Sequence, residues 1–228
     1  MPRSVEAAYR RCVLPLYLLC LLLSGCKNTT VVDTHRAAPM SLEAGDAIVV
    51  LGRRHTGNHE TEYDFIECVG SALQDNDSLR VIPEQEFVDA MYPYFEASTA
   101  PMDVSNLDNL IREPAVLQRF SDFHIRYFVW IDGFTERTAS SGSMTCAVGP
   151  GGGGCFGFTT WDDEAKYEAS LWDFRNRELS GKISAETQGT SLMPAIIIPI
   201  PLLARVQANA CRNMADQIRG FLQPEQPG

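Results

Sequence analysis

The first 25 residues constrain this chain more than any other segment, because they decide in which compartment the rest of it folds. Arg3, Arg10 and Arg11 give the segment a cationic start, and an apolar run follows at residues 12–23. That run is shorter than the ~20 apolar residues that a membrane-spanning helix needs, and Pro15 within it disfavours a long uninterrupted helix. Residues 1–25 are therefore predicted to be an export signal rather than a transmembrane anchor.

A cysteine in a distinctive setting follows the apolar run. The segment LSGC, residues 23–26, resembles the lipobox of bacterial lipoproteins, in which the signal is cleaved before a cysteine that then takes lipid. The resemblance implies a membrane anchor of several acyl chains on Cys26; the alternative is an ordinary secretory signal that ends at Cys26 by chance. Lys27 replaces the aspartate that retains lipoproteins in the inner membrane, so the resemblance implies the outer membrane, with the protein facing the periplasm.

Removal of the signal leaves a strongly acidic chain. The full sequence has 19 Lys and Arg against 29 Asp and Glu, and the signal carries three arginines and Glu6. The mature chain therefore has a net charge near −12, which disfavours nucleic acid as a partner because binding to phosphates requires basic patches. About 200 mature residues suit one domain with its own core.

Four cysteines remain once Cys12 and Cys20 leave with the signal and Cys26 carries lipid. They are Cys68, Cys146, Cys155 and Cys211. An even number in an exported, oxidising compartment predicts two disulfides, for which three pairings are possible. Cys146 and Cys155 are close in the chain and separated by turn residues, and the other two fall on predicted helices, so we expect the pairs 146–155 and 68–211. A cysteine-rich metal site is the alternative, but no CxxC is present.

The mature chain shows a succession of predicted strands and helices between two flexible ends. Residues 26–45 are predicted to be the lipidated N-terminus and a tether, and residues 223–228 a tail. Periodicity predicts strands at 46–52, 79–82 and 125–139, helices at 60–73, 105–111, 114–123 and 203–221 with a short one after Pro83, and a hairpin of 164–174 with 178–191. Three prolines make 193–203 an extended connector rather than a central strand.

This order of elements predicts the fold class and carries a family resemblance. The fold is expected to be α/β (α+β), a mixed β-sheet with helices packed on it, in a single disulfide-stabilised domain at 46–222. In its order of elements the chain resembles envelope lipoproteins of the curli-secretion and penicillin-binding-protein-activator type and the N-terminal domain of TolB. The resemblance includes the hairpin YEASLWDFRNRELSGKISAETQG, in which Asp173 and Gly181 fit a pattern that recurs in those proteins. The chain is also similar to uncharacterised bacterial lipoproteins. The segments CAVGPGGGGCFGF and MPAIIIPIP depart from the pattern of the named families.

The glycine-rich segment 146–158 lacks the features of known catalytic loops. A phosphate-binding loop needs a lysine and a hydroxyl after its last glycine, and Cys155 and Phe156 stand there instead. A nest of backbone amides that binds an anion is the alternative. We expect no cofactor, and no metal unless His55 and His59, four residues apart, bind one; solvated loop histidines are the simpler interpretation.

These observations predict a non-enzymatic module that binds, assembles with or regulates another envelope protein. The candidate contact surface comprises aromatic residues of the loop 91–101 and of the glycine-rich hairpin: Tyr92, Tyr94, Phe95, Phe156 and Phe158. For the three aromatic residues of the loop, packing in the core is the alternative. The alternative is a periplasmic hydrolase or small-ligand-binding protein whose site has no sequence motif. A deep pocket with converging titratable groups would favour that alternative, and an exposed apolar patch would favour the binding module.

Overall fold

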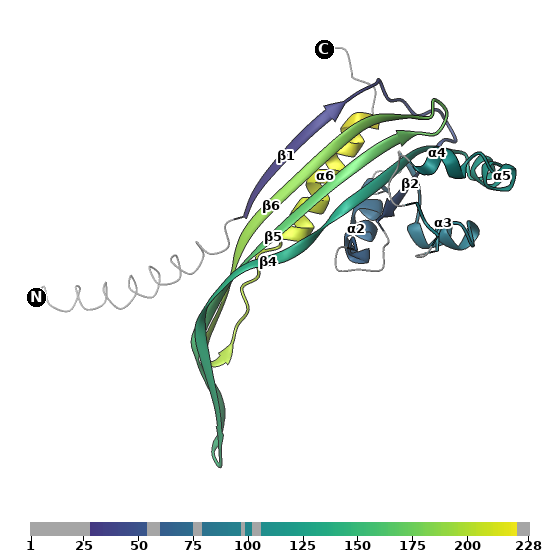
Figure 1. Ribbon diagram of the computed structural model, residues 1–228. Helices are drawn as coiled ribbons and strands as arrows, with labels where there is room; N and C mark the ends of the chain where they lie inside the picture. Colours follow the sequence, from purple (N-terminus) through teal and green to yellow (C-terminus); the bar gives the residue numbers. More distant parts are fainter. Residues whose placement is uncertain (1–27, 54–59, 75–78, 97–98, 102–105, 223–228) are drawn as a thin grey trace, which may run out of the picture. The chain divides into compact units, whose positions relative to one another are not determined.

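The computed structural model describes residues 28–53, 60–74, 79–96, 99–101 and 106–222, which form one mixed β-sheet with helices packed on it (Figure 1). The strands are β1 (Asn28–Arg36), β2 (Ala47–Gly52), β3 (Arg80–Ile82), β4 (Ile125–Gly149), β5 (Gly152–Asp173) and β6 (Glu178–Pro199). The helices are α2 (Tyr63–Gln74), α3 (Glu84–Ala90), α4 (Leu107–Leu110), α5 (Pro114–Asp122) and α6 (Val206–Leu222). The sheet order is β1-β6-β5-β4-β2-β3, so the predicted fold class is confirmed.

The described residues belong to two compact units. The main unit comprises the described parts of 30–136, 164–188 and 205–222, and the hairpin unit comprises residues 28–29, 137–163 and 189–204. The long strands β4, β5 and β6 each contribute residues to both units.

The main unit is organised around β2, which is parallel to both of its neighbours. Ala47 lies opposite Arg80 of β3, and Gly52 lies opposite Ile131 of β4. All six residues of β2 are buried. This explains its uninterrupted apolar sequence, because a strand covered on both faces does not alternate between apolar and polar residues.

Helices cover both faces of the sheet in the main unit. On one face α3, α4 and α5 pack over a core that includes Phe87, Phe120 and Phe128, whose ring centroids lie 5.4–6.0 Å apart. The other face carries α2, whose Phe65 stacks on Tyr167 of β5 with 3.5 Å between centroids. On that face α6 is so close to β6 that a Cβ at Gly181 would come within 2.7 Å of the Phe221 ring.

Both expected disulfides are present. Cys68 of α2 is bonded to Cys211 of α6, with 6.2 Å between their Cα atoms. Cys146 of β4 is bonded to Cys155 of β5 across 4.0 Å, close to the turn that joins the two strands. The glycine-rich segment is therefore the disulfide-closed end of a β-hairpin, as the sequence predicts.

The expected flexible tether is wrong for residues 28–36, which form β1. This strand runs antiparallel to β6: the hydroxyls of Thr30 and Thr187 are 3.1 Å apart, and Ala37 donates its N–H to the carbonyl of Ser180 at 2.9 Å. Most of its side chains are exposed, so the strand is held by its backbone and leaves little hydrophobic periodicity in the sequence. Cys26 lies outside the described residues.

The expected connector at 193–203 is also wrong in part, because residues 193–199 continue β6. Pairing of Thr30 with Thr187 places the start of β1 opposite Gly189, so no described part of β1 lies beside β6 beyond that point. Beyond Gly189 the side of β6 that faces away from β5 is therefore an edge of the sheet with respect to β1. A proline is tolerated on an edge because its missing N–H has no neighbouring strand to bond. Instead of packing in a core, this end is exposed, with Ile196 77% accessible.

Candidate functional site

The hairpin unit differs from the rest of the molecule in charge. No Asp, Glu, Lys, Arg or His occurs between Thr138 and Trp161, or between Gly189 and Ala204, although 21% of the whole chain is Asp, Glu, Lys or Arg. The charges of this unit are confined to Arg137, Asp162 and Asp163. Two strands and the end of a third therefore form a surface without formal charge in an acidic protein.

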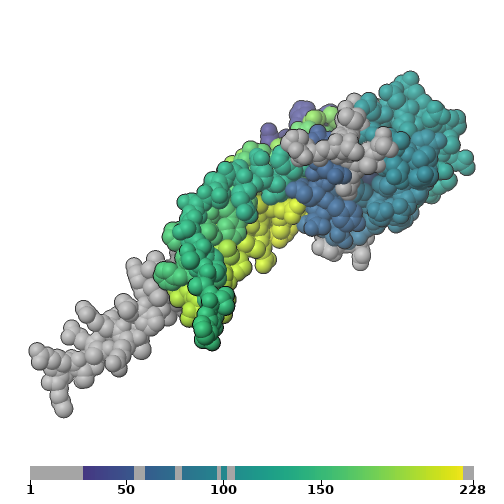
Figure 2. Space-filling model, turned by 60° about the horizontal axis from the view of Figure 1, so that its bottom comes forward, coloured from purple at the N-terminus to yellow at the C-terminus, as the bar shows by residue number. Residues whose placement is uncertain are grey.

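Apolar side chains gather on this uncharged surface. Most of the large hydrophobic side chains that the described residues expose belong to the hairpin unit: Val148, Phe156, Phe158, Ile196, Ile197, Ile198, Ile200 and Leu203. Val148 is 92% and Phe156 76% accessible. In the space-filling view the green β4–β5 hairpin lies openly at the surface with part of the yellow-green end of β6 beside it (Figure 2).

An open groove of about 740 Å³ crosses one face of the hairpin unit. Phe156 and Phe158 of β5 line it together with Ile196 and Ile197 of β6, and β4 contributes small side chains that include Ser143. No titratable side chain lines this groove, so it is suited to apolar contact rather than to acid–base chemistry.

Two glycines allow β4 and β5 to approach closely beneath the groove. Gly142 and Gly157 both adopt positive φ angles, +96° and +137°. A Cβ at Gly142 would lie 2.4 Å from the carbonyl oxygen of Phe158, and one at Gly157 would lie 2.3 Å from that of Ser143. Any larger residue would therefore push the two strands apart, which explains why glycine occurs within the strands as well as in the turn.

The structure separates the five predicted contact residues. Phe156 and Phe158 are exposed in the hairpin unit, and Tyr92 is exposed in the main unit. The prediction that Phe95 lies on the contact surface is wrong, because its side chain is buried and packs edge-on against Phe87 with 4.8 Å between ring centroids. Tyr94 is half-buried against the same core. The proline-interrupted sequence of 91–101 is compatible with a loop or with a packed turn, and the structure shows packing for Tyr94 and Phe95, whose rings complete the core.

The isoleucines at the end of β6 and Val148 are exposed residues that the local sequence pattern does not mark. Hydrophobic residues are expected inside, and the run IIIPI lies in the expected extended connector. The signal that could have found them is the absence of charge over two long segments, 138–161 and 189–204. Exposed strands without any charged residue are unusual enough to mark an interaction surface.

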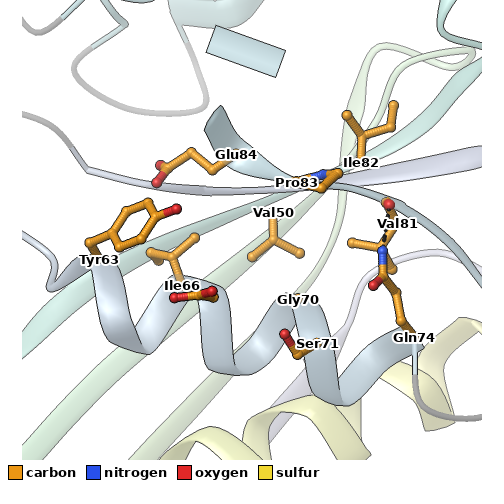
Figure 3. Close-up of a pocket in the computed structure, with 11 residues that line it drawn as sticks. Val50, Tyr63, Ile66, Gly70, Ser71, Gln74, Val81, Ile82, Pro83 and Glu84 are labelled. Atoms are coloured by element: carbon orange, nitrogen blue, oxygen red, sulfur yellow. Dashed lines mark hydrogen bonds between the residues drawn. The ribbon is translucent and has the colours of Figure 1, made fainter. Parts of the chain in front are cut away.

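A second candidate, a crevice of about 150 Å³, lies in the main unit between α2 and residues 81–84 (Figure 3). Two of its polar side chains already serve the fold. Gln74 donates its side-chain N–H to the carbonyl of Val81 at 2.8 Å, and the Glu84 carboxylate accepts the N–H of Gly52 at 2.9 Å. The volume is below the ~300 Å³ at which ligand pockets usually begin.

The other buried titratable groups of the main unit hold elements together. The Tyr167 hydroxyl donates to Glu62 at 3.0 Å and lies 2.8 Å from the Thr135 hydroxyl, and burial raises the pKa of Tyr167 above its ordinary value. A 2.6 Å hydrogen bond from Lys166 lowers the pKa of Glu164. None of these groups lines a deep pocket in the part of the chain that the structure describes.

The metal prediction concerns residues that the structure does not place. His55 and His59 lie outside the described residues. Among those that are described, no three His, Cys, Asp or Glu side chains gather closely enough to hold a metal ion. The described helices include none that is long and apolar enough to cross a membrane.

Comparisons with known proteins give distant structural similarity alone. No family model matches the chain, and no curated protein matches it. Among solved structures, the PelC dodecamer from Paraburkholderia phytofirmans is 13% identical, with a TM-score of 0.40, over 87% of this chain and 100% of that one. A variant PelC dodecamer from the same organism is 12% identical, with a TM-score of 0.39, over 85% of this chain and 98% of that one.

Proposed function

We propose that this chain is a lipoprotein of a bacterial envelope, held in the outer membrane by lipid on Cys26 and facing the periplasm. It works as a non-enzymatic binding and assembly module for another envelope protein, and the hairpin unit makes the contact. The proposal extends the lipobox resemblance at residues 23–26 and the likeness to envelope lipoproteins.

The observation that carries this proposal is the exposed, uncharged surface of the hairpin unit. Exposure of Val148, Phe156 and Ile196 to water costs free energy that burial against a partner would recover, at ~25 cal/mol per Å² of apolar area. Large apolar patches on monomeric proteins mark interaction sites more often than chance. The groove between Phe158 and Ile197 supplies the concave part of such a site.

The position of the anchor supports the same proposal. Cys26 precedes Asn28, the first residue of β1, by two residues, and Asn28 belongs to the hairpin unit. The lipid would thus be attached directly before an ordered strand and not at the end of a long tether. An anchor placed there would keep the hairpin unit near the membrane, where other envelope proteins are found.

Site-specific photocrosslinking in intact cells tests the proposal. A photoreactive amino acid at Phe156 or Ile196 is expected to give a discrete crosslinked protein, while the same group at Val31, an exposed position on β1 of the main unit, gives none. Equal labelling at all three positions would contradict the proposed surface.

The lipid anchor is tested separately. The Cys26→Ser variant is expected to leave the membrane fraction or to retain its signal, because no thiol remains to take the lipid. If it were still acylated and membrane-bound, the lipobox assignment would be wrong.

A further inference from the structure

One edge of the hairpin unit has no strand beside it. In the sheet order β4 lies between β5 and β2, and the register of β2 ends where Gly52 faces Ile131. The segment Thr138–Gly149 of β4 therefore pairs with β5 on one side and with no other described strand on the opposite side. Its backbone N–H and C=O groups on that side form an open edge.

The opposite edge of the same unit, along β6, is protected. Leu192 and Leu202 exchange two backbone hydrogen bonds of 2.9 and 2.7 Å, so the chain folds back along β6. Pro194 and Pro199 lack an N–H to offer on this strand. A covering segment and prolines are two of the devices by which proteins prevent strands from pairing with foreign edges.

The β4 edge carries no such protection. Thr138–Gly149 contains neither a charge nor a proline, and every residue in it is exposed except the half-buried Met144. Its single irregularity, Gly142, faces β5 and not the open edge, since a Cβ there would meet the carbonyl of Phe158. Both faces of this segment are also uncovered, and short hairpins without a covered face are marginally stable alone.

We infer that Thr138–Gly149 pairs with the same segment of a second copy of this chain, antiparallel and about a two-fold axis. This inference rests on the proposed role of the hairpin unit as the binding surface, and it names the partner at one edge.

The distribution of charge favours a second copy over an unrelated strand. The mature chain is acidic, so copies repel one another except where the surface is uncharged, as it is from Thr138 to Trp161. Because β6 is protected, a head-to-tail chain of β4 on β6 is blocked, and two-fold pairing closes at a dimer.

Cysteine pairs map this contact in the full-length exported protein with its native disulfides formed. Single cysteines at Ser140, Ser141, Ser143 and Thr145, all exposed, are mixed two variants at a time and oxidised. Antiparallel two-fold pairing predicts crosslinks only between positions whose numbers add to one constant. The matched control is Thr190→Cys, which lies on the protected strand of the same unit and should crosslink to none of them.

A charge placed on the edge gives a second measurement. Ser143→Lys should weaken dimerisation, followed by analytical ultracentrifugation, by about tenfold or more, because a lysine on an exposed edge strand opposes its pairing with another edge. Thr190→Lys should leave it unchanged.

The inference is overturned by crosslinks between Thr145→Cys and Thr190→Cys, by crosslinks without a constant sum, or by a monomer at all concentrations. A monomer that still labels another envelope protein from Phe156 would overturn the self-pairing and leave the proposed function standing. A dimer that gives no label other than itself would overturn binding to a different protein and leave the self-pairing intact.

Discussion

At the scale of single residues, Asp173 holds together more of the main unit's polar interior than its position at a strand end suggests. Its carboxylate pairs with Arg126 of β4, and the two side chains are 2% and 9% exposed. The same carboxylate accepts the backbone N–H of Asn176 at 2.9 Å and the side-chain N–H of Asn176 at 3.0 Å. One side chain thus connects β4 to the turn between β5 and β6.

Asp173→Asn is expected to destabilise the main unit strongly. The amide keeps the volume of the carboxylate, but the buried guanidinium of Arg126 loses its counter-charge, a change that costs about 3–5 kcal/mol. The matched control is Asp163→Asn, which breaks a pair with Arg137 in which the guanidinium is 59% exposed. Exposed pairs contribute about 0–1 kcal/mol. Urea denaturation measures both variants, and equal shifts of the midpoint would contradict the assigned role of Asp173.

At the scale of elements, the two disulfides act on different parts of the chain. Cys68–Cys211 joins α2 to α6 and closes a loop across a sequence separation of 143, whereas Cys146–Cys155 closes one of 9. The chain-entropy model gives about 5 kcal/mol for the first loop and about 2.6 kcal/mol for the second. Their structural settings differ further, because the first links two buried helix faces and the second lies in a unit with exposed strands.

Replacing Cys68 and Cys211 by serine is therefore expected to lower the stability of the main unit by up to about 5 kcal/mol. Replacing Cys146 and Cys155 should leave the unfolding of the main unit nearly unchanged. Tryptophan fluorescence separates the two units, since Trp130 and Trp172 are buried in the main unit and Trp161 belongs to the hairpin unit. A large loss of main-unit stability in the second variant would show that the two units unfold together.

The elements also show which parts of the fold could be predicted from sequence. Strands buried on one or both faces, such as β2 and the first half of β4, leave an apolar pattern in the sequence. The turn residues and the two cysteines of 146–158 predicted the disulfide-closed end of the β4–β5 hairpin. Segments exposed on both faces leave none, so β1 and the outer half of β4 were not predicted as strands. The role of Phe95 was missed for a related reason, because irregular segments carry no periodicity that reveals which side chains are buried.

The candidate surface was predicted in part. Phe156 and Phe158 were found because a hairpin turn is expected to be exposed. Ile196 and its neighbours were missed because an apolar run with prolines suggests packing, whereas none of the described helices belongs to the hairpin unit to cover them. That limit is set by how elements far apart in the chain pack, and no local pattern reports it.

At the scale of the whole molecule, the two units differ in the free energy that the local opening of a segment is expected to cost. Helices cover both faces of the sheet in the main unit, and residues such as Val49 and Phe128 are fully buried. In the hairpin unit the strands are uncovered, and the apolar side chains face solvent. Opening a segment costs little where few apolar contacts are lost and up to the full unfolding free energy where a core is disrupted.

Amide hydrogen exchange is therefore expected to distinguish the two units. Amides of β2 and of residues 127–131 should exchange only through global unfolding, and Asp173→Asn should speed them in proportion to the lost stability. Amides of 138–149 and 152–161 should exchange faster by local opening, at a rate that Asp173→Asn does not change. A single exchange free energy across both units would contradict this difference.

The same measurement at rising protein concentration reports on the open edge of β4. The N–H groups of a strand point to its two sides in turn, so only alternate amides of 138–149 lie on the open edge. Pairing of two copies should slow these alternate amides as dimers form and leave their neighbours, already bonded to β5, much less affected. Because Ser143→Lys weakens the pairing, it should shift the concentration dependence to at least about tenfold higher protein concentration while the amides of β2 remain protected. Uniform slowing along the whole hairpin would instead indicate that association covers its faces and leaves the edge unpaired.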